Sequence, residues 1–500
     1  MNLFSKDYTY KTLTIAVLVF GIASIIIVQF WTPTLFGADG YLHIRMAEFI
    51  KDYGLKYDFH WARYSTFAKN FADKDLLYHI LLIPFVKFFS NIFFGAKLSA
   101  IFFSAIFLIV FFIILRLYSI KPLVPLFLLA LLISDRFFYL FCWPRQMIIV
   151  IALTILGIHF LIEEKYWPVF IITFAYCLAH VSGPYMLLYA ILTELTRFLN
   201  SKRFNFKSLW VVGLAIVIAY LVHPNFPNNI FVFYLNAIMV PIYSVKWGLE
   251  LGAEFFPIST RDYFFSYPFL VFSIVLIPIV AVFLRPKATL RTQVFLLHSL
   301  VFLIFSFLSQ RYIAHGYPLI LLSLASYIQD YSKENGGQAE ILNFKLLFYP
   351  GLIFLCALGV IFGISTYKNL RQFALVHRAY DSHYESVGEF FKQNIPKKEL
   401  VFHTNWSDSQ YFIGVDPDND YFVTFDPIYM VSYDRQLYDL YRNVSFGREK
   451  DPYEILKNTF HANYGYAGKN YFSGLIEQIR GDPRFKILGE DSLGVVFKLE

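Results

Sequence analysis

Residues 12–31, TLTIAVLVFGIASIIIVQFW, form one unbroken apolar run. Crossing the hydrocarbon core of a bilayer takes about 20 mostly apolar residues, because the membrane interior offers no partner to an unpaired backbone N–H or C=O group. The run is long enough for this, and no small-residue cleavage site follows it, as would be typical of a removed signal peptide. The sequence therefore predicts a membrane-spanning helix here.

Similar apolar runs recur over the first 366 residues. With the first they make eleven candidate spans, and the sequence predicts a polytopic α-helical membrane protein with about 11–13 transmembrane helices. The stretch 230–245 is either a re-entrant element or a further span. The stretch 76–94 is interrupted by His79, Pro84 and Lys87, which favours an amphipathic helix lying on the membrane surface. The other ten candidate spans are 98–116, 123–141, 147–162, 167–181, 184–198, 209–222, 265–284, 293–309, 312–328 and 346–366.

The composition excludes a soluble globular enzyme. Of 500 residues, 57% are hydrophobic, 20% are aromatic and only 16% are charged, whereas about a quarter are charged in an average soluble domain. The net charge is +7, but the basic residues cluster in short loops between apolar runs, which indicates membrane topology and no nucleic-acid partner. Cys142, Cys177 and Cys356 lie in or beside apolar segments, so we expect neither a disulfide framework nor a paired-cysteine metal site.

The basic residues also predict the orientation in the membrane. If the N-terminus lies in the cytoplasm, the opposite short loops hold only Arg145 and Arg311 as basic residues. This asymmetry follows the positive-inside rule. We therefore expect an integral protein of the cytoplasmic (inner) membrane, with the loop 32–97, the segment 223–264 and the C-terminal domain outside. The segments expected in the cytoplasm are 1–11, 116–122, 163–166, 197–208, 285–292 and 329–345.

The last third of the chain changes character. Residues 1–366 are expected to form the transmembrane domain, with 76–94 as part of its outer loop, and the polar residues 367–500 a C-terminal extracytoplasmic α/β domain. The runs ELVFH and YFVTF predict strands, and SLGVVFKLE predicts a closing strand.

The first candidate site follows the first span. Gly37 and Gly40 flank Asp39, and His43 and Arg45 lie in the helix that follows. One interpretation is that Asp39 caps this helix by accepting backbone N–H bonds. The alternative is that Asp39 is a general base or metal ligand at the membrane surface, with His43 and Arg45 near a phosphate.

The second candidate site is the segment from Gln310 to Pro318, at the start of a predicted span. Arg311 is either an interfacial anchor or a functional cation. It lies on the side that is poor in basic residues, and a planar guanidinium suits the phosphate of a lipid-linked substrate. His315, one helical turn later, would share its face.

The third candidate site is Trp406 and Asp408, directly after the predicted strand ELVFH. The carboxyl end of a strand is a common binding position. A buried Trp followed by a helix-capping Ser407 or Asp408 is the structural alternative. Three weaker candidates, Glu250, Glu254 and Asp262, fall in an outer segment that could fold over a site.

The order of these features resembles the polytopic membrane glycosyltransferases of the GT-C fold, in particular the catalytic subunits of oligosaccharyltransferase. The points of likeness are the acidic and basic positions from Asp39 to Glu48, the surface helix at 76–94, the segment from Arg311 to Pro318, and an α/β outer domain. That domain has Trp406-Ser407-Asp408 where those enzymes carry Trp-Trp-Asp. The resemblance implies an inverting hexosyl- or oligosaccharyl-transferase that uses a polyprenyl-phosphate-linked donor.

The chain departs from that family at two motifs. Ser407 stands in place of the second Trp of Trp-Trp-Asp, so we do not expect recognition of an asparagine acceptor sequon. The other departure is an acidic motif. Oligosaccharyltransferases carry a second acidic motif that binds a divalent metal, whereas residues 143–147 here read Trp-Pro-Arg-Gln-Met, without a carboxylate. We therefore do not count on a cofactor, although a site of that type would take Mg²⁺ or Mn²⁺. We expect Arg145 to bind the donor phosphate directly.

The resemblance also implies the roles of the site residues. Asp39 would deprotonate or orient the acceptor nucleophile, and Arg145, Arg311 and a histidine, His43 or His315, would stabilise the leaving phosphate. The partners implied are the lipid donor, membrane lipids and a glycan, lipid or protein acceptor. The alternatives are a transporter or flippase of lipid-linked glycans and a non-catalytic envelope-assembly protein. Transporter folds often contain internal repeats, and this sequence shows none.

Overall fold

The computed structural model describes residues 6–247, 249–284, 287–334, 345–470 and 472–500. Parts of the predicted cytoplasmic segments 1–11, 285–292 and 329–345 therefore lie outside the described residues. The chain divides into two compact units. The first, here called the bundle unit, comprises Met1–Trp31, Ser99–Ala219 and Gly252–Leu375, and the second, the α/β unit, comprises Thr32–Leu98, Tyr220–Leu251 and Val376–Glu500.

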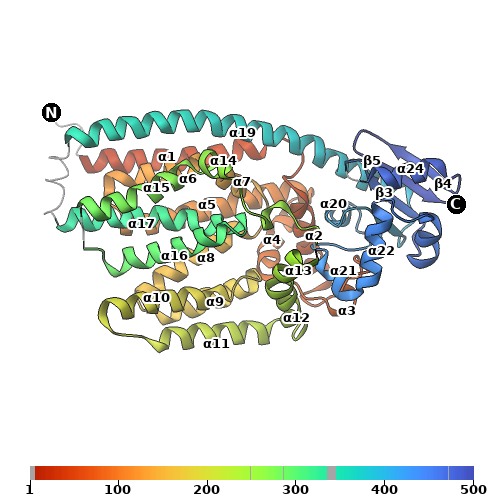
Figure 1. The fold of residues 1–500 in the computed structure, drawn as a ribbon, viewed down its shortest axis with the longest axis horizontal. Helices are drawn as coiled ribbons and strands as arrows, with labels where there is room; N and C mark the ends of the chain where they lie inside the picture. Colours follow the sequence, from red (N-terminus) through yellow and green to blue (C-terminus); the bar gives the residue numbers. More distant parts are fainter. Residues whose placement is uncertain (1–5, 248, 285–286, 335–344, 471) are drawn as a thin grey trace. The chain divides into compact units, whose positions relative to one another are not determined.

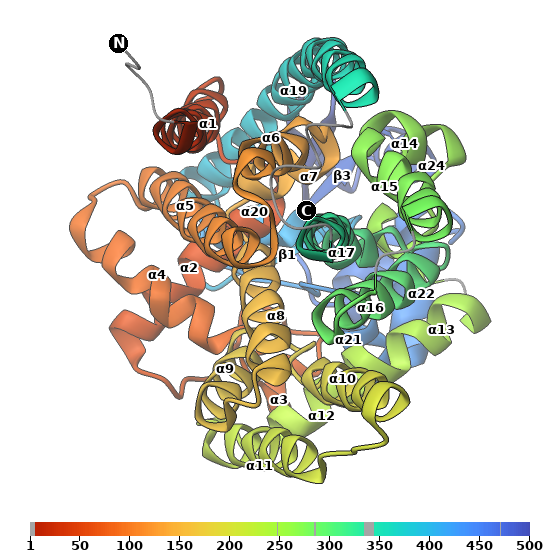
Figure 2. The same cartoon turned by 90° about the vertical axis from the view of Figure 1, so that its left-hand side faces the viewer.

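The bundle unit consists of helices that run side by side, as Figures 1 and 2 show. The core of this unit is apolar, and its helices also expose large apolar side chains on their outer faces. Examples are Trp167, Trp210 and Phe307, which are 70%, 77% and 67% exposed. A soluble helix would turn polar residues outward, so this pattern is typical of helices that face lipid. Its elements are α1 (Lys6–Gln29), α5 (Ile92–Tyr118), η1 (Lys121–Leu123), α6 (Val124–Ile133), α7 (Asp135–Cys142), α8 (Met147–Ile162), α9 (Tyr166–Ala179), α10 (Tyr185–Ser201), α11 (Phe206–Val222), η3 (Ala253–Phe255), α14 (Thr260–Ser266), α15 (Pro268–Ile279), η4 (Val280–Leu284), α16 (Leu290–Ser306), η5 (Gln310–Tyr312), α17 (Ile313–Glu334) and the first part of α19 (Lys345–Asn394).

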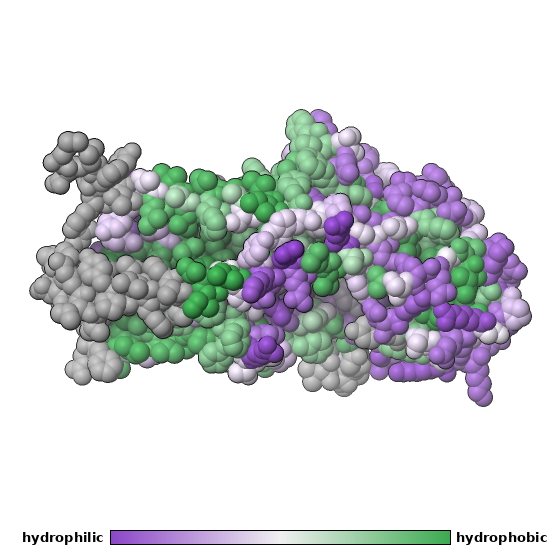
Figure 3. All heavy atoms as spheres, turned by 90° about the horizontal axis from the view of Figure 1, so that it is seen from above, coloured by the Kyte–Doolittle hydropathy of each residue, from purple (hydrophilic) through white to green (hydrophobic). Residues whose placement is uncertain are grey.

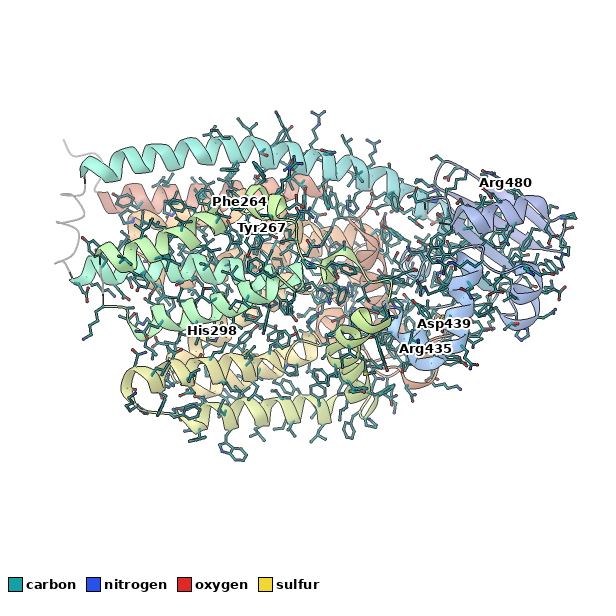
Figure 4. The ribbon with its side chains drawn as sticks, viewed as in Figure 1. Phe264, Tyr267, His298, Arg435, Asp439 and Arg480 are labelled. Atoms are coloured by element: carbon teal, nitrogen blue, oxygen red, sulfur yellow. The ribbon has the colours of Figure 1, made fainter. Side chains whose placement is uncertain are left out.

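A helix begins within a few residues of every predicted span, but two predicted spans are not straight. The span predicted at 123–141 bends by 79° between α6 and α7, and that at 265–284 by 90° between α14 and α15. Ser134 is extended and its hydroxyl accepts the N–H of Phe137, which starts α7 as a new helix. Tyr267, labelled in Figure 4, precedes Pro268, whose ring lacks the N–H that a continuing helix needs.

The helices are those of an integral membrane protein. Among the described residues two helices, Tyr10–Gln29 and Ile92–Tyr118, are long and apolar enough to cross a bilayer alone, and the count reaches four if each bent pair forms one span. Several further apolar helices of 10–17 residues accompany them. In Figure 3 hydrophobic colour covers much of the visible surface of the bundle helices, whereas hydrophilic colour gathers over the C-terminal residues.

The α/β unit is built on a five-stranded sheet of order β2-β1-β3-β5-β4. β1 pairs in parallel with β2 and β3, and β5 pairs antiparallel with β3 and β4. All four residues of β1, LVFH, are buried, as a strand covered on both faces requires. The strands are β1 (Leu400–His403), β2 (Asp420–Tyr421), β3 (Tyr464–Gly468), β4 (Phe485–Glu490) and β5 (Gly494–Leu499).

The predicted strand YFVTF was wrong beyond its first residue, because β2 ends at Tyr421, whereas the predicted strands at ELVFH and at the C-terminal end are confirmed.

The helices of the α/β unit come from three separate parts of the sequence. The helices are α2 (Ala38–Tyr53), α3 (Phe67–Asn70), α4 (Leu76–Phe88), α12 (Asn228–Tyr234), η2 (Leu235–Met239), α13 (Val240–Trp247), the last part of α19, α20 (Asp408–Val415), α21 (Ile428–Tyr433), α22 (Arg435–Ser445), α23 (Pro452–Glu454), η6 (Ile455–Thr459) and α24 (Ser473–Gly481).

Two ambiguous stretches of the sequence belong to this unit. The surface helix predicted at 76–94 ends earlier, at Phe88, because Phe89 is extended, and Ile92 already begins α5. The stretch 230–245 is helical throughout, with a turn of π-helix over Leu235–Met239 between α12 and α13. It packs with 32–98 and the C-terminal residues in one unit.

Candidate functional site

Asp39 lies in the first turn of α2 and is half-buried. Gly37 precedes the helix with φ 76° and ψ 158°, a conformation that a residue with a side chain adopts only under strain. Gly37 is the N-cap, so the interpretation of Asp39 as the N-cap was wrong. The Asp39 carboxylate instead lies in the first turn, where the partial positive charge of the helix N-terminus favours an anion.

Asp381, on α19, holds the chain just before Asp39. Its Oδ2 accepts the backbone N–H of Gly37 at 3.3 Å and lies 3.0 Å from Nδ1 of His377, and its Oδ1 accepts the hydroxyl of Tyr411. Asp381 is fully buried. Burial, and then the carboxylates of Asp381 and Asp39, raise the pKa of Tyr411 well above its usual value. Asp39 therefore lies close enough to Tyr411 to affect its pKa, beside the hydrogen-bonded pair of Tyr411 and Asp381.

A second hydrogen bond ties the same turn of α2 to α19. The hydroxyl of Tyr41 donates to Oε1 of Glu385 and accepts the N–H of Leu35 at 3.2 Å. Burial raises the pKa of Glu385 above its ordinary value. With Asp381, this gives α19 two carboxyl groups that fix the start of α2.

Arg45, the other basic residue predicted for this site, joins α2 to α20. Its Nε and Nη2 donate to the carbonyl oxygen of Gly414 at 2.9 and 2.6 Å, and its Nη1 pairs with Glu48. These bonds occupy both sides of the guanidinium group. Gly414 allows the close approach, because a Cβ there would lie 2.6 Å from Cβ of Tyr41.

In the bundle unit, Arg145 and Arg311 meet at one carboxylate. Arg145 Nη1 lies 3.3 Å from Glu254 Oε2, and Arg311 Nη2 lies 2.8 Å from Glu254 Oε1. The Arg311 guanidinium also stacks 4.1 Å above the Phe255 ring. The side chains of Arg145, Arg311 and Glu254 are 21%, 33% and 32% exposed, so the group is accessible. Two guanidinium groups far apart in sequence thus converge on a single anion.

The segment that carries Glu254 is held against the start of the Arg311 helix. Ser309 donates its hydroxyl to the Glu254 carbonyl at 2.8 Å, and the Gln310 N–H donates to the carbonyl of Phe256 at 3.0 Å. Glu254 is therefore placed by its backbone as well as by its two ion pairs.

His315 lies on α17, which begins directly after Arg311 and Tyr312, and its side chain is buried. Its Nδ1 lies 3.5 Å from the Thr154 hydroxyl, and its ring stacks on Phe302 with centroids 5.1 Å apart. His298, labelled in Figure 4, shows what a structural histidine in the bundle does. Its ring nitrogens lie 2.7 and 3.1 Å from the carbonyl oxygens of Val294 and Tyr189.

Trp406 and Asp408 lie where β1 leads into α20. Trp406 is half-buried, and its indole donates to the carbonyl of Glu250 at 2.7 Å. Asp408 is 2% exposed, and burial raises its pKa to about 7, with the Tyr384 hydroxyl beside it. Ser407 makes no capping bond, so the predicted Ser cap at this helix was wrong. Asp408 therefore belongs to the interior of the unit.

The structure thus groups the predicted residues by unit. Arg145, Arg311 and His315 belong to the bundle unit, and the arginines share Glu254. Asp39, His43, Arg45, Trp406 and Asp408 belong to the α/β unit.

Two further residues near Asp39, Asp381 and Glu385, were not predicted from the sequence. Asp381 and Glu385 lie one turn apart in a long helix, where an acidic pair is typical of a solvated face. A sign was available for Glu385 but not for Asp381, because the run SHYESVGEFF around Glu385 is rich in aromatic residues, of which Tyr384 and Phe391 are buried.

Neither a protein-family model nor a curated protein sequence matches the chain. Solved structures do match. The oligosaccharyltransferase of Archaeoglobus fulgidus aligns with a TM-score of 0.62 at 11% identity, over 94% of this chain and 70% of that chain. ArnT from Cupriavidus metallidurans, solved with undecaprenyl phosphate, aligns with a TM-score of 0.59 at 12% identity, over 96% and 97%.

A third match has a much longer chain. The arabinofuranosyltransferase AftD from Mycobacteria aligns with a TM-score of 0.51 at 9% identity, over 96% of this chain and 40% of that chain. The Archaeoglobus enzyme has also been solved with dolichol-phosphate and an inhibitory peptide, and with Zn and sulfate. At these identities the likeness concerns the fold. The chain has the GT-C fold of membrane glycosyltransferases, as its sequence motifs predicted.

Proposed function

We propose that this protein is an inverting glycosyltransferase of the cytoplasmic membrane. It moves a sugar or glycan from a polyprenyl-phosphate-linked donor to an acceptor at the outer face. The N-terminus lies in the cytoplasm, residues 1–366 form the membrane domain and residues 367–500 the outer domain that presents the acceptor.

The observation that carries this proposal is the shared carboxylate of Arg145 and Arg311. Two guanidinium groups at 3.3 and 2.8 Å from one anion form a site for a doubly hydrogen-bonded oxyanion such as phosphate. A transferase must stabilise the negative charge that develops on the leaving phosphate, and preorganised cations are the largest source of such stabilisation. The solved structures with undecaprenyl phosphate and dolichol-phosphate support a donor of this class.

Asp39 supplies the other half of the reaction. Its carboxylate, at the start of α2, deprotonates or orients the acceptor nucleophile, while Arg145 and Arg311 receive the leaving phosphate. The apolar bundle gives the isoprenoid chain a surface that water does not compete for. A histidine, His43 or His315, assists the transfer.

A divalent cation does not fit the donor set around Arg145. The carboxylate there, Glu254, already faces two guanidinium groups within 3.5 Å, and an added Mg²⁺ or Mn²⁺ would be repelled by both. We therefore assign the charge stabilisation to the arginines.

The test is a comparison of glycans in a deletion strain that carries either the wild-type chain or Asp39→Asn. Mass spectrometry of lipid-linked and surface glycans should show the same loss of product with Asp39→Asn as with the deletion, at normal abundance of the variant in the membrane. Asp52→Asn is the matched control, because Asp52 lies on the same helix, is 48% exposed and pairs only weakly with Lys51 at 3.2 Å.

Two outcomes would overturn the proposal. Full product with Asp39→Asn would remove the role of Asp39. Accumulation of an unflipped lipid-linked intermediate in the inner leaflet, with no missing transfer product, would identify a transporter instead.

A further inference from the structure

Three buried ionisable side chains form a line in the α/β unit, and the proposed function leaves most of this line unused. His43 Nδ1 lies 2.7 Å from His79 Nε2, and His79 Nδ1 lies 2.6 Å from Asp73 Oδ2. The three residues are 4%, 0% and 3% exposed. They come from α2, from α4 and from the segment before α4, and the two helices lie side by side in Figures 1 and 2.

Asp73 is the fixed end of the line. Its Oδ1 accepts the N–H of Asp75 at 3.0 Å, and its carbonyl oxygen lies 3.0 Å from Nε2 of His223. Burial alone would raise the pKa of Asp73, but the charge and hydrogen bond of His79 lower it below the ordinary value. Asp73 is therefore held as a carboxylate, which accepts hydrogen bonds and donates none.

When both histidines are neutral, the carboxylate determines their tautomers. Since Asp73 can only accept, His79 donates from Nδ1, and a neutral His79 then has a lone pair at Nε2. His43 donates its Nδ1–H to that lone pair, which leaves the basic electron pair of His43 on Nε2. A base oriented by a second group, itself oriented by a carboxylate, is the arrangement that activates general bases in many enzymes.

His43 is also in the right place on α2. It follows Asp39 by four residues, and residues with this spacing lie on the same face of a helix, about one turn apart. Burying two imidazoles and a carboxylate costs free energy that apolar packing between α2 and α4 would not cost. Perturbed ionisable groups of this kind cluster at functional sites.

We propose that His43 is the proton acceptor of the transfer reaction, with His79 and Asp73 as positioning residues; this rests on the proposed function. The acceptor's O–H bond breaks and its proton goes to Nε2 of His43, while the acceptor oxygen forms a bond to the anomeric carbon. The bond from that carbon to the phosphate oxygen breaks, and its electron pair leaves with the phosphate. Asp39 then orients the acceptor and does not take its proton.

The pH dependence of the rate distinguishes this role from a structural one. His43 must be neutral to accept a proton, so the rate rises with pH through the titration of the histidine pair. The Asp73 carboxylate favours the protonated pair, and removing its charge should move this rise to lower pH. The other titratable groups around the pair are Asp39 on α2, Tyr78 on α4, Tyr411 on the neighbouring α20, Lys74 and Asp75 before α4, Tyr57, and His223.

The experiment uses the full-length protein in membrane vesicles of the deletion strain, which contain the accumulated donor and acceptor. His43→Gln should lower the initial rate at least about 100-fold, the usual contribution of a general base. Asp73→Asn should lower the rate and move the acidic limb of the pH profile to lower pH, and Asp73→Glu should restore the wild-type limb in part. The matched control is His60→Gln, because the His60 side chain is 60% exposed, pairs with Asp420 at 2.9 Å, and should leave rate and profile unchanged when it is replaced.

Each result decides the question. An unshifted pH profile in Asp73→Asn, or a full rate in His43→Gln, overturns the proposal. If these variants do not accumulate, His79→Gln and Asp73→Glu decide it, because a purely structural line predicts a lower amount of active protein with an unchanged profile. No transfer product with the wild-type chain would instead contradict the proposed function, whatever the variants do.

Discussion

The carboxyl group of Asp408 links the stability of the α/β unit to pH. Burial raises its pKa from 3.8 to about 7, so between these values the folded protein holds a proton that the unfolded chain has released. Stability must then fall as the pH rises from about 4 to 7 and level off above that range. A rise of this size corresponds to roughly 4 kcal/mol, as an upper limit. Asp408→Asn removes the effect, so the variant should gain thermal stability relative to the wild type as the pH rises.

The measurement is the unfolding temperature of both proteins in detergent at a series of pH values from 4 to 8. Asp418→Asn is a suitable control, because Asp418 is 40% exposed and pairs with the exposed Lys397. A constant difference between Asp408→Asn and the wild type across the series would contradict the buried, protonated state of Asp408.

Single residues also show where sequence reasoning succeeded. Arg311 was predicted as a phosphate ligand because it lies on the side poor in basic residues, and Arg145 because it stands where the resembled family has an acidic motif; the structure brings both arginines to one carboxylate, and their role at a phosphate stays a prediction. Asp39 and His43 could be selected by their spacing after the first span. Asp73 and Asp381 could not, because the role of Asp73 depends on how the chain turns to bring it to His79, and that of Asp381 on a backbone N–H of Gly37, which is distant in sequence.

At the scale of elements, the short η3 that carries Glu254 acts on the arginine pair. The carboxylate of Glu254 neutralises part of the positive charge of Arg145 and Arg311. Glu254 therefore competes with the donor phosphate for these two arginines. Glu254→Gln should therefore bind polyprenyl phosphate more tightly, by up to about fivefold, since exposed ion pairs contribute about 1 kcal/mol or less. Arg311→Ala should weaken binding, and Arg311→Lys should restore it only in part, because an ammonium cannot bind two oxygens side by side.

The measurement is the affinity of each purified variant for polyprenyl phosphate, by fluorescence quenching or calorimetry. It shows whether each substitution strengthens or weakens binding. Asp262→Asn is the control, because Asp262 lies in the same segment of the chain and pairs with Arg136 at 3.5 Å, with both side chains exposed. Weaker binding by Glu254→Gln would mean that Glu254 organises the arginines instead of competing for them.

The same element predicts the response to metal removal. Since the positive charge at this site comes from two guanidinium groups, transfer activity in vesicles should be unchanged after EDTA treatment. Manganese or magnesium added back should not raise the rate. A loss of rate that Mg²⁺ or Mn²⁺ restores would show that a cation takes part, and the assignment of charge stabilisation to the arginines alone would be wrong.

Elements were predictable from the sequence to the extent that hydrophobicity determines them. Apolar runs predicted the positions of the bundle helices, but not the bends at Ser134 and Tyr267, because a capping hydroxyl and a proline interrupt the backbone bonds without interrupting the hydrophobicity. The strand predicted at YFVTF failed for the opposite reason. Its run of apolar residues suits the consecutive buried loop positions after Tyr421 as well as it suits a strand.

At the scale of the whole molecule, the sequence order hides the composition of the units. The boundary predicted at residue 366 separates apolar from polar sequence, whereas the α/β unit also takes in Thr32–Leu98 and Tyr220–Leu251. Contacts such as Trp406 to Glu250 and Arg45 to Gly414 hold these segments to the C-terminal residues. Hydropathy cannot predict such pairings, since they depend on single hydrogen bonds between segments that are hundreds of residues apart.

The proposed reaction requires residues of both units to reach one donor, and this can be measured by cross-linking. In a chain whose native cysteines are replaced by Ala, cysteines at positions 39 and 311 should be joined by a short bifunctional maleimide and detected as linked peptides by mass spectrometry. Cysteines at 145 and 311 are the positive control, because both native side chains contact Glu254 within one unit. Cysteines at 52 and 311 are the negative control, because Asp52 lies near the other end of α2 from Asp39. Linked peptides from the positive control without any from positions 39 and 311 would mean that carboxylate and guanidinium groups do not share a substrate, and the transferase mechanism would have to be abandoned.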